Sequence, residues 1–185
     1  MTTQLERSER LTKAEWRELE KQTGLRHEYL DGWVFEMPKE SRKHNVIVGN
    51  LLEVLRPIAR AKNCDVFVLS VSTQVEEGRS LYYPDLVVTC DPSDDDPYEI
   101  RRPCLIVEVL SPSTAGKDKR EKLKAYTDLP TLERYVLIDQ EARRVEVHRK
   151  HSWNWTYQEL LEDGEFDVPC LGGSITLEQV YAGLD

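Results

Sequence analysis

One carboxylate stands inside the most apolar stretch of the sequence. Residues 104–110 read CLIVEVL, and Glu108 is the only acidic residue among them. Because neither set of alternate positions is polar, the stretch is typical of a strand that is covered on both faces. An unpaired, ionised carboxylate there would cost several kcal/mol in lost hydration. Glu108 is therefore expected to be protonated, paired with a cation or bound to a metal ion. A structural salt bridge, or a place at the solvated end of the strand, is the simpler alternative.

A second acid, Asp85, lies in a similar setting. It follows Pro84, which suits the entry of a strand or a bulge, and it precedes the apolar residues 86–88. An aspartate beside a proline is more often a turn residue, so Asp85 alone is weak support for a site. Asp85 and Glu108 on adjacent buried strands would form an oxygen-ligand site suited to Mg²⁺, which needs one or two protein carboxylates plus water. Mg²⁺ is the expected cofactor, with Mn²⁺ as an alternative.

A lysine on the next predicted helix supplies positive charge. With about 100° per residue counted from Asp118, Lys122 lies in the middle of the inward face, beside Tyr126. A lysine on a core face needs an anionic partner, and either Glu108 or Asp118 could provide it. A lysine that reaches solvent along the helix edge is the alternative. The same helical wheel places Lys117, Arg120 and Lys124 on the opposite, solvated side and Lys119 at the border.

An aspartate, a glutamate and a lysine that converge over a sheet edge are the minimal apparatus for metal-dependent phosphodiester hydrolysis. The carboxylates would hold one or two metal ions, which polarise the phosphate and lower the pKa of the attacking water. The lysine would place positive charge near that water or near the developing negative charge. This chemistry requires Asp85, Glu108 and Lys122 to meet in one cleft.

These side chains can meet only if the surrounding elements bring them together. Strand, helix and strand over residues 104–139 form a βαβ-like unit, beside antiparallel hairpins such as the one that turns at Asp31 and Gly32. We expect an α/β or α+β domain with a mixed central sheet flanked by helices. The predicted strands cover 64–75, 82–90, 104–110, 134–139, 143–149 and 153–161, and the predicted helices cover about 12–21, about 40–61, 118 onward and 176–184.

The composition limits the class of protein. The chain has 185 residues and a net charge of −9, which suits a globular domain and disfavours non-specific binding of nucleic acid by charge alone. No window approaches the roughly 18 consecutive apolar residues of a transmembrane helix, so no membrane partner is expected. The polar N-terminal stretch lacks the apolar run of a secretory signal, and we expect a cytoplasmic protein. Residues 1–24 are expected to form a helical segment packed on a single domain of residues 25–185.

The four cysteines do not show a metal-binding pattern. Cys64, Cys90, Cys104 and Cys170 are widely spaced and include no C-x-x-C pair, which argues against a zinc site. Cys90 and Cys104 border apolar runs and are interpreted as small core residues. We expect free thiols in a reducing compartment.

Four stretches of the chain resemble a known family. YPD at 83–85, IVEVLSPST at 106–114, DKREKLKAY at 118–126 and ERYVLID at 133–139 are similar to the bacterial putative restriction endonuclease family, formerly catalogued as a domain of unknown function. This family belongs to the PD-(D/E)XK nuclease superfamily. The resemblance covers about residues 25–182 and implies a restriction-endonuclease-like core.

The resemblance also implies roles for individual residues. Asp85 takes the place of the motif aspartate and Glu108 that of the second acid. The lysine expected two residues after that acid is Leu110 here, and Lys122 stands where such families carry a lysine moved to the next helix. Glu28, in HEYLDG at 27–32, corresponds to an acid often counted with the site, although it is also an ordinary hairpin residue. His44 matches a recurrent histidine, and an ordinary place at a helix N-terminus is its alternative.

A basic stretch, RRVEVHRKH at 143–151, has two interpretations. It is either a solvated edge hairpin or a surface that contacts the DNA backbone with help from Lys117, Lys119 and Arg120.

Our first hypothesis is a Mg²⁺-dependent DNA endonuclease, and RNA as substrate is left open. The alternative is a catalytically inactive nuclease-fold module that binds nucleic acid or protein, which the net charge favours modestly. A hydrolase for another phosphoester is a third hypothesis. Because cutting both strands of a duplex commonly takes two active sites, a homodimer is expected.

Overall fold

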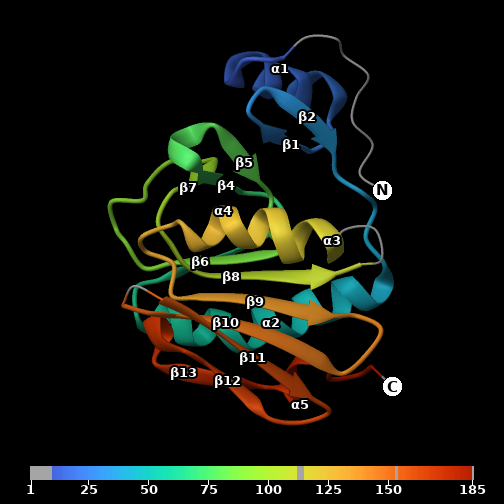
Figure 1. Ribbon diagram of the computed structural model, residues 1–185, viewed down its shortest axis with the longest axis vertical. Coiled ribbons are helices and arrows are strands. Elements are labelled where there is room, and N and C mark those ends of the chain that lie inside the picture. Colours follow the sequence, from blue (N-terminus) through green and yellow to red (C-terminus); the bar gives the residue numbers. More distant parts are fainter. Residues whose placement is uncertain (1–9, 112–114, 153, 185) are drawn as a thin grey trace.

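A six-stranded mixed sheet forms the centre of the computed structural model, which describes residues 10–111, 115–152 and 154–184 (Figure 1). Its strand order is β11-β10-β9-β8-β6-β3, and each neighbouring pair is antiparallel except β8 and β9, which are parallel. The parallel pair is joined by a helical crossover, as the βαβ-like pattern predicts. The strands are β3 (Asp65–Val68), β6 (Leu86–Thr89), β8 (Pro103–Leu110), β9 (Arg134–Asp139), β10 (Arg144–His151) and β11 (Asn154–Leu161).

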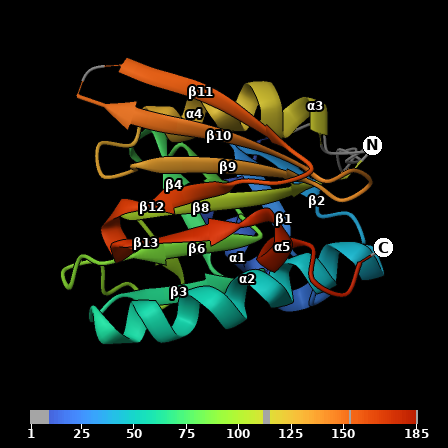
Figure 2. The same cartoon turned by 90° about the horizontal axis from the view of Figure 1, so that it is seen from below.

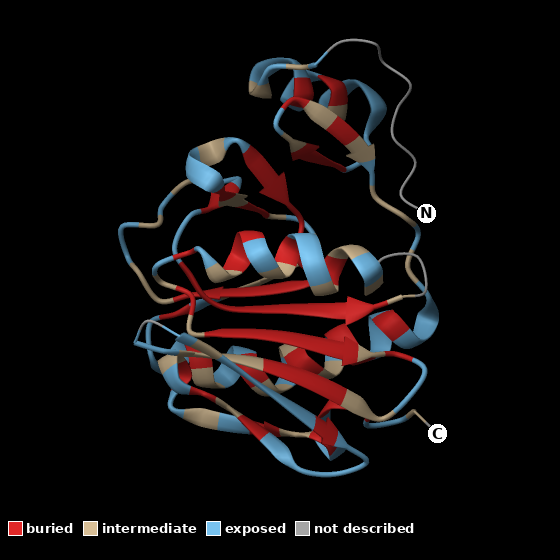
Figure 3. Ribbon diagram, viewed as in Figure 1, coloured by how far each residue is buried: buried red, intermediate tan, exposed pale blue. Residues whose placement is uncertain are grey.

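Helices cover both faces of this sheet, as Figure 2 shows. On one face lies α2 (Arg42–Ala61), and on the other lie α3 (Ala115–Lys117), a π-helical turn (Asp118–Lys122) and α4 (Leu123–Thr127). All eight residues of β8 are buried, and Figure 3 shows the central strands as the buried layer of the molecule. Alternate residues of β8 enter two different cores: Leu105, Val107 and Val109 pack on the α2 side, and Ile106 and Leu110 pack on the α4 side.

A second, five-stranded sheet carries the N-terminal elements. Its order is β2-β1-β5-β4-β7, and α1 (Lys13–Thr23) packs on it with Thr12 as N-cap in a capping box. Trp16 and Leu19 of α1 join a small separate core with Tyr29 and Leu81. The β1–β2 hairpin turns at residues 31–32, as predicted. Its strands are β1 (His27–Leu30), β2 (Trp33–Glu36), β4 (Ser72–Val75), β5 (Ser80–Tyr82) and β7 (Glu99–Ile100), with a 3₁₀ turn over Glu76–Gly78.

The C-terminal region differs from the sequence prediction. A hairpin of β12 (Glu165–Val168) and β13 (Gly173–Thr176) was not predicted, and it surrounds a 3₁₀ turn over Pro169–Leu171. The predicted helix over 176–184 is shortened to α5 (Leu177–Val180), whose N-cap is Thr176. The hairpin strands have four residues each, which is too short for a clear alternation of apolar and polar side chains. Among the described residues, no helix is long and apolar enough to cross a membrane.

The expectation of free thiols is wrong. Two disulfides are present, Cys64–Cys90 and Cys104–Cys170, and no cysteine is free. Spacing along the chain does not indicate this proximity, because the bonded cysteines are 26 and 66 positions apart in sequence and only the tertiary structure brings them together. Since Asp65 pairs with Thr89 in the β3–β6 register, Cys64 and Cys90 lie opposite each other at the end of that pair.

Candidate active site

The register of the central sheet brings the two predicted acids together. Leu86 of β6 pairs with Val107 of β8, so Asp85, one residue earlier, lies opposite Glu108. Residues directly opposite in an antiparallel pair project to the same face of the sheet. That face is the one covered by the segment 115–127, since Val87 and Ile106, two residues away from these acids, pack against α4. Both acids are buried, with 6% of Asp85 and 3% of Glu108 exposed.

Lys122 lies among three carboxylates, as the helical wheel predicted for its inward face. Its Nζ is 3.0 Å from Oε1 of Glu108, 3.1 Å from Oε1 of Glu28 and 3.1 Å from Oδ1 of Asp118. Lys122 is only 4% exposed, so it is not a lysine that reaches solvent along the helix edge. Tyr126, one turn later, donates a hydrogen bond from its hydroxyl to the same Oε1 of Glu108 at 3.2 Å.

A π-helical turn positions this lysine. The N–H of Leu123 donates to the carbonyl of Asp118, five residues earlier, and the hydroxyl of Tyr135 donates to that carbonyl at 3.1 Å. A π turn holds one residue more than an α turn and therefore changes which side chains share a face. The α-helical wheel placed Lys117 on the solvated side, and this is wrong. Lys117 lines the site, pairs with Glu28 and lies over the ring of Phe35.

Asp85 is held by a backbone amide and a histidine. The N–H of Val109 donates to its Oδ2 at 2.7 Å, and Nε2 of His44 lies 3.0 Å from the same oxygen. His44 is buried in the first turn of α2, whose N-cap Ser41 accepts from the His44 N–H. The same imidazole nitrogen lies 3.4 Å from Oε2 of Glu40. His44 therefore contacts the predicted acid Asp85 from its place in the first turn of α2.

Burial and charge shift the ionisation of the central pair. Burial raises the pKa of Glu108 well above its usual value, because the charge of Lys122 offsets only part of the lost hydration and Asp118 and Asp85 add repulsion. Burial alone would lower the pKa of Lys122, but Glu108, Glu28 and Asp118 raise it well above its usual value. Lys122 therefore keeps its charge to a higher pH than a free lysine, and Glu108 takes a proton more readily than a free glutamate.

Two outer groups of the site have pKa values shifted in opposite directions, lower for Glu28 and higher for His44, and both shifts favour the charged form. Burial of Glu28 favours its neutral form, but the charges of Lys122 and Lys117 outweigh burial and lower its pKa. Burial disfavours the imidazolium of His44, but its hydrogen bond to Asp85 and the charges of Asp85 and Glu40 raise its pKa. Burial raises the pKa of Glu40 itself. Glu28 is therefore an anion, and His44 is a cation over a wider pH range than a free histidine.

The residues present fit a hard divalent cation. A cavity of about 20 Å³ lies between the acids, which is room for a single water or ion. Carboxylate oxygens are the ligands that Mg²⁺ prefers. The lining contains more carboxyl groups than ammonium groups, so with its acids ionised it would carry an excess of negative charge that a divalent cation offsets. Its ionisable residues are Glu28, Glu40, Asp85, Glu108, Asp118, Lys117 and Lys122.

Two of the three residues predicted to bind substrate lie outside this cavity. Lys119 pairs with Glu146 of β10, and Arg120 is exposed and donates to the carbonyl of Gly116. The basic stretch 143–151 forms β10, which pairs with the exposed edge strand β11, so it lies in an edge hairpin, as the first of its two interpretations predicts. His148 is stacked on Tyr135 there. Arg144 and Arg149 of this strand also pair with acids, Arg144 with Glu146 and Glu159, and Arg149 with Asp167.

Sequence reasoning missed Glu40. It precedes the first turn of α2 and lies four residues before His44, close enough to contact its imidazole. The sequence feature that could have indicated Glu40 is an acid four residues before a histidine at the start of a predicted helix, a spacing that on a helix places both side chains on one face. Tyr82 of β5 was also missed: its ring lies under Lys122, with Nζ 5.8 Å from the ring centre. It comes from the second sheet, and nothing in the local sequence indicates this contact.

Comparisons with known proteins identify the family from the sequence and support the fold from a solved structure. Residues 14–178 match the Uma2 family, described as putative restriction endonucleases. Two uncharacterized proteins of Synechocystis are similar over most of their length: slr1290 is 28% identical, covering 95% of this chain and 93% of its own, and sll1609 is 33% identical, covering 85% and 92%. The crystal structure of a putative nuclease of the DUF820 family from Anabaena variabilis superposes with a TM-score of 0.68. It is 19% identical in sequence and covers 86% of this chain and 91% of its own.

Proposed function

This chain belongs to the Uma2 family of putative restriction endonucleases, and we propose that it is a Mg²⁺-dependent endonuclease that hydrolyses phosphodiester bonds of DNA. The observation that carries the proposal is the convergence of Asp85, Glu108 and Lys122. They come from three separate segments, share one face of the central sheet and line one small cavity. A buried cluster with this excess of carboxylates is costly unless a cation is held there, which supports a metal site.

Each residue of the site has a separate role in the proposed hydrolysis. Asp85 and Glu108 would hold the metal, which supplies polarisation of the phosphate and a lowered pKa of the attacking water. Lys122 keeps a positive charge where negative charge develops on the phosphate. Tyr126 fixes the orientation of Glu108, and His44 fixes that of Asp85. These last two are positioning residues, because their contacts are with the acids.

A cleavage assay with matched variants tests this function. The purified chain is incubated with single- and double-stranded DNA and with RNA, each with Mg²⁺, Mn²⁺ or a chelator. We expect metal-dependent cleavage by the wild type and loss of cleavage in Asp85→Asn, because the substitution removes a ligand charge while keeping its shape. Lys124→Met, at an exposed position two residues after Lys122, is the control and should cleave as the wild type does.

The result that would count against the proposal is equally definite. If no nucleic acid is cut with either metal, or if Asp85→Asn cuts as fast as the wild type, hydrolysis at this site is ruled out. Cleavage of RNA alone would retain the mechanism and replace the substrate.

One observation favours a second candidate, a nuclease-fold module that binds without hydrolysis. The chain has a net charge of −9, and Lys117 and Lys119 are both engaged with acids. Calorimetric titration with Mn²⁺ separates the two functions. Binding tighter than about 1 mM that is lost in Asp85→Asn supports the metal site. No binding in that range favours the module.

Location in the cytoplasm is part of the same proposal. A DNA substrate would be encountered there, and fractionation of cells that express the tagged chain measures it.

A further inference from the structure

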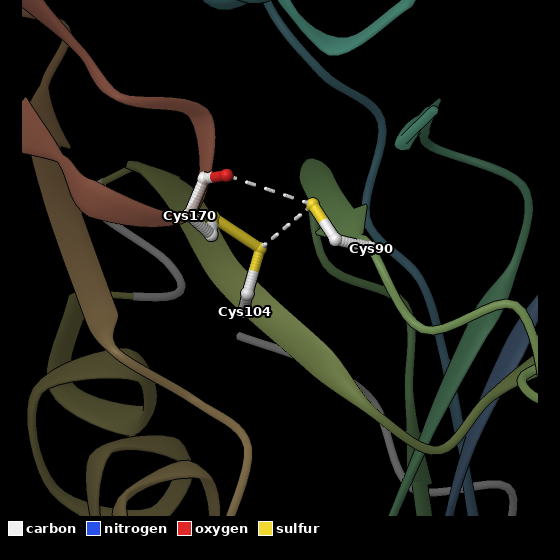
Figure 4. A group of neighbouring side chains, drawn as sticks. All are labelled: Cys90, Cys104 and Cys170. Atoms are coloured by element: carbon white, nitrogen blue, oxygen red, sulfur yellow. Dashed lines mark hydrogen bonds between the residues drawn. A yellow bond between two sulfur atoms is a disulfide. The ribbon is translucent and has the colours of Figure 1, made fainter. Parts of the chain in front are cut away.

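Four cysteines from four segments meet at the end of the central sheet away from the acids. Cys64 precedes β3, Cys90 follows β6, Cys104 lies near the start of β8, and Cys170 lies in the 3₁₀ turn between β12 and β13. The sulfurs of Cys90, Cys104 and Cys170 all lie within 4.8 Å of one another (Figure 4). Cys64 is bonded to Cys90, so the fourth sulfur adjoins this group.

We propose that these four cysteines, when reduced, form a tetrahedral thiolate site for one Zn²⁺ ion. Four sulfurs at Zn–S distances of about 2.3 Å on a tetrahedron lie about 3.8 Å apart. The sulfurs of Cys90 and Cys104, which are not bonded to each other, are 3.9 Å apart. Four thiolates with no oxygen or imidazole ligand are typical of a closed, structural zinc site.

The surroundings suit such a site. Cys104 and Cys64 are 7% and 5% exposed, so their sulfurs are sheltered from solvent. Cys104 is fixed in the most buried strand, and Cys64 and Cys90 end two paired strands, so three of the four ligands are held on regular structure. A zinc ion with four thiolates carries a net charge of −2. The ammonium of Lys62 lies 3.8 Å from the position that a Cβ would take on Gly172, two residues after Cys170 in the chain.

The chemistry balances without any group beyond a thiol reductant. Each disulfide accepts two electrons and two protons from a dithiol, which becomes a disulfide itself, and yields two cysteine thiols. Zn²⁺ then replaces the four thiol protons, which are released to solvent. In the reverse direction, a disulfide oxidant removes two electrons per cysteine pair, and zinc leaves as the two protein disulfides form.

This site is separate from the proposed active site. Cys104 and Glu108 lie on the same strand, four residues and hence about 13 Å apart along it. Substitution of the acids therefore should not disturb the sulfurs, and the two metal sites can be tested independently. Asp85→Asn serves as the control for metal bound at the carboxylates.

Cobalt titration of the full chain tests the proposal. The protein is reduced with a phosphine, exchanged into oxygen-free buffer and titrated with Co²⁺, which reports tetrahedral thiolate ligation by its intense thiolate-to-cobalt absorption. We expect these bands to saturate at about one Co²⁺ per chain. Zn²⁺ added afterwards should displace Co²⁺ and remove the bands. Asp85→Asn should give the same titration, and the oxidised chain should give no bands.

The double variant Cys90→Ser, Cys170→Ser should lose the bands, because only two thiols remain. Circular dichroism shows whether this variant is folded. The test of the proposal does not require a folded double variant, because the titration of the reduced wild type alone can contradict the proposal. If the reduced wild type shows no thiolate-to-cobalt absorption, the cysteines do not form a metal site and the proposal is wrong. Absorption that disappears in Asp85→Asn, or that persists in the double variant, overturns it as well.

Discussion

The ammonium group of Lys122 is the shared counterion of three buried acids. Three carboxylates contact its ammonium, and none of the four groups is more than 4% exposed. Removing one partner of a buried ion pair is costly because the remaining charge has neither water nor a counterion. The same residue that we assign to transition-state charge therefore also supports the folded state, and its two roles have to be separated by experiment.

Replacing Lys122 by methionine should lower the free energy of unfolding by about 3–5 kcal/mol. Adding Glu108→Gln to that variant should restore part of the loss, since the buried carboxyl left without its ammonium partner is then replaced by a neutral group. Urea denaturation in the absence of metal measures both values, with Lys124→Met as the exposed control on the same segment. Equal stability of the wild type and Lys122→Met would show that this ion cluster does not support the fold.

The His44–Asp85 pair should make stability depend on pH. Because the pKa of His44 is raised in the folded protein, its contribution is fully present below the unfolded value of about 6.5. It is lost as the pH rises through the folded value. The stability difference between the wild type and Asp85→Asn should therefore be larger at low pH than at high pH. Urea denaturation at a series of pH values on both sides of about 6.5 measures this difference. The variant His151→Asn, at the exposed end of β10, should show the same dependence of stability on pH as the wild type. A constant difference at every pH would contradict this role for the pair.

At the scale of elements, the π turn over Asp118–Lys122 allows Lys117 and Lys122 to face the site together. Lys117 contacts Glu28 from one end of the turn, and Lys122 contacts Glu28 and Glu108 from the other. In a continuous α-helix these two residues are about 140° apart. The wider turn reduces this angle, and it is anchored by the hydrogen bond from Tyr135 to the carbonyl of Asp118.

Inserting one alanine between Arg120 and Glu121 should separate the two lysines. The π turn already holds one residue more than an α turn, so a further residue rotates one end of the segment by about 100°, and either Lys117 with Asp118 or Lys122 leaves the site. We expect metal-dependent cleavage to fall by about 10- to 100-fold, as misplacement of a catalytic group commonly costs. Glu121→Gln keeps the length and can still accept from Tyr82, so it should retain activity. An insertion variant with wild-type cleavage would show that the spacing of Lys117 and Lys122 is not required.

At the scale of the whole molecule, the site lies where two sheets and two helical segments meet. Asp85 and Glu108 come from the six-stranded sheet and Glu28 from the five-stranded sheet. Helix α2 supplies His44, and the segment 115–127 supplies Lys122. This arrangement provides one site per chain, whereas cleavage of both strands of a duplex in one binding event takes two.

We therefore predict that the active form is a symmetric dimer. Sedimentation equilibrium of the full chain should give twice the 21.5 kDa of one chain. The measurement is best made with and without duplex DNA in the presence of Ca²⁺, so that bound DNA is not cut. A chain that stays monomeric at every concentration and still cuts both strands together would contradict this prediction.

Several elements were predictable from local sequence, but two predicted strands are not single strands. The stretch 64–75 divides into β3 and β4 of different sheets, and 82–90 is interrupted before Asp85, between the end of β5 and the start of β6. The capping box at Thr12, the turn at Asp31 and Gly32 and the apolar run ending at Leu110 each depend on neighbouring residues, and each is confirmed. The prediction was less accurate where a few residues decide the structure. The β12–β13 hairpin was too short for a pattern, and the π turn cannot be distinguished from an α turn by periodicity over five residues.

What the sequence alone determined is the chemistry that was available: a buried acid that needs a counterion, a second acid at a strand entry, and a lysine on an inward face. Their meeting was decided by tertiary structure, because β-sheet register sets which side chains on separate strands face each other. The same reason accounts for the cysteines, whose spacing along the chain argued against a shared site. Only the pairing of β3 with β6 and the position of the 3₁₀ turn beside β8 bring their sulfurs together.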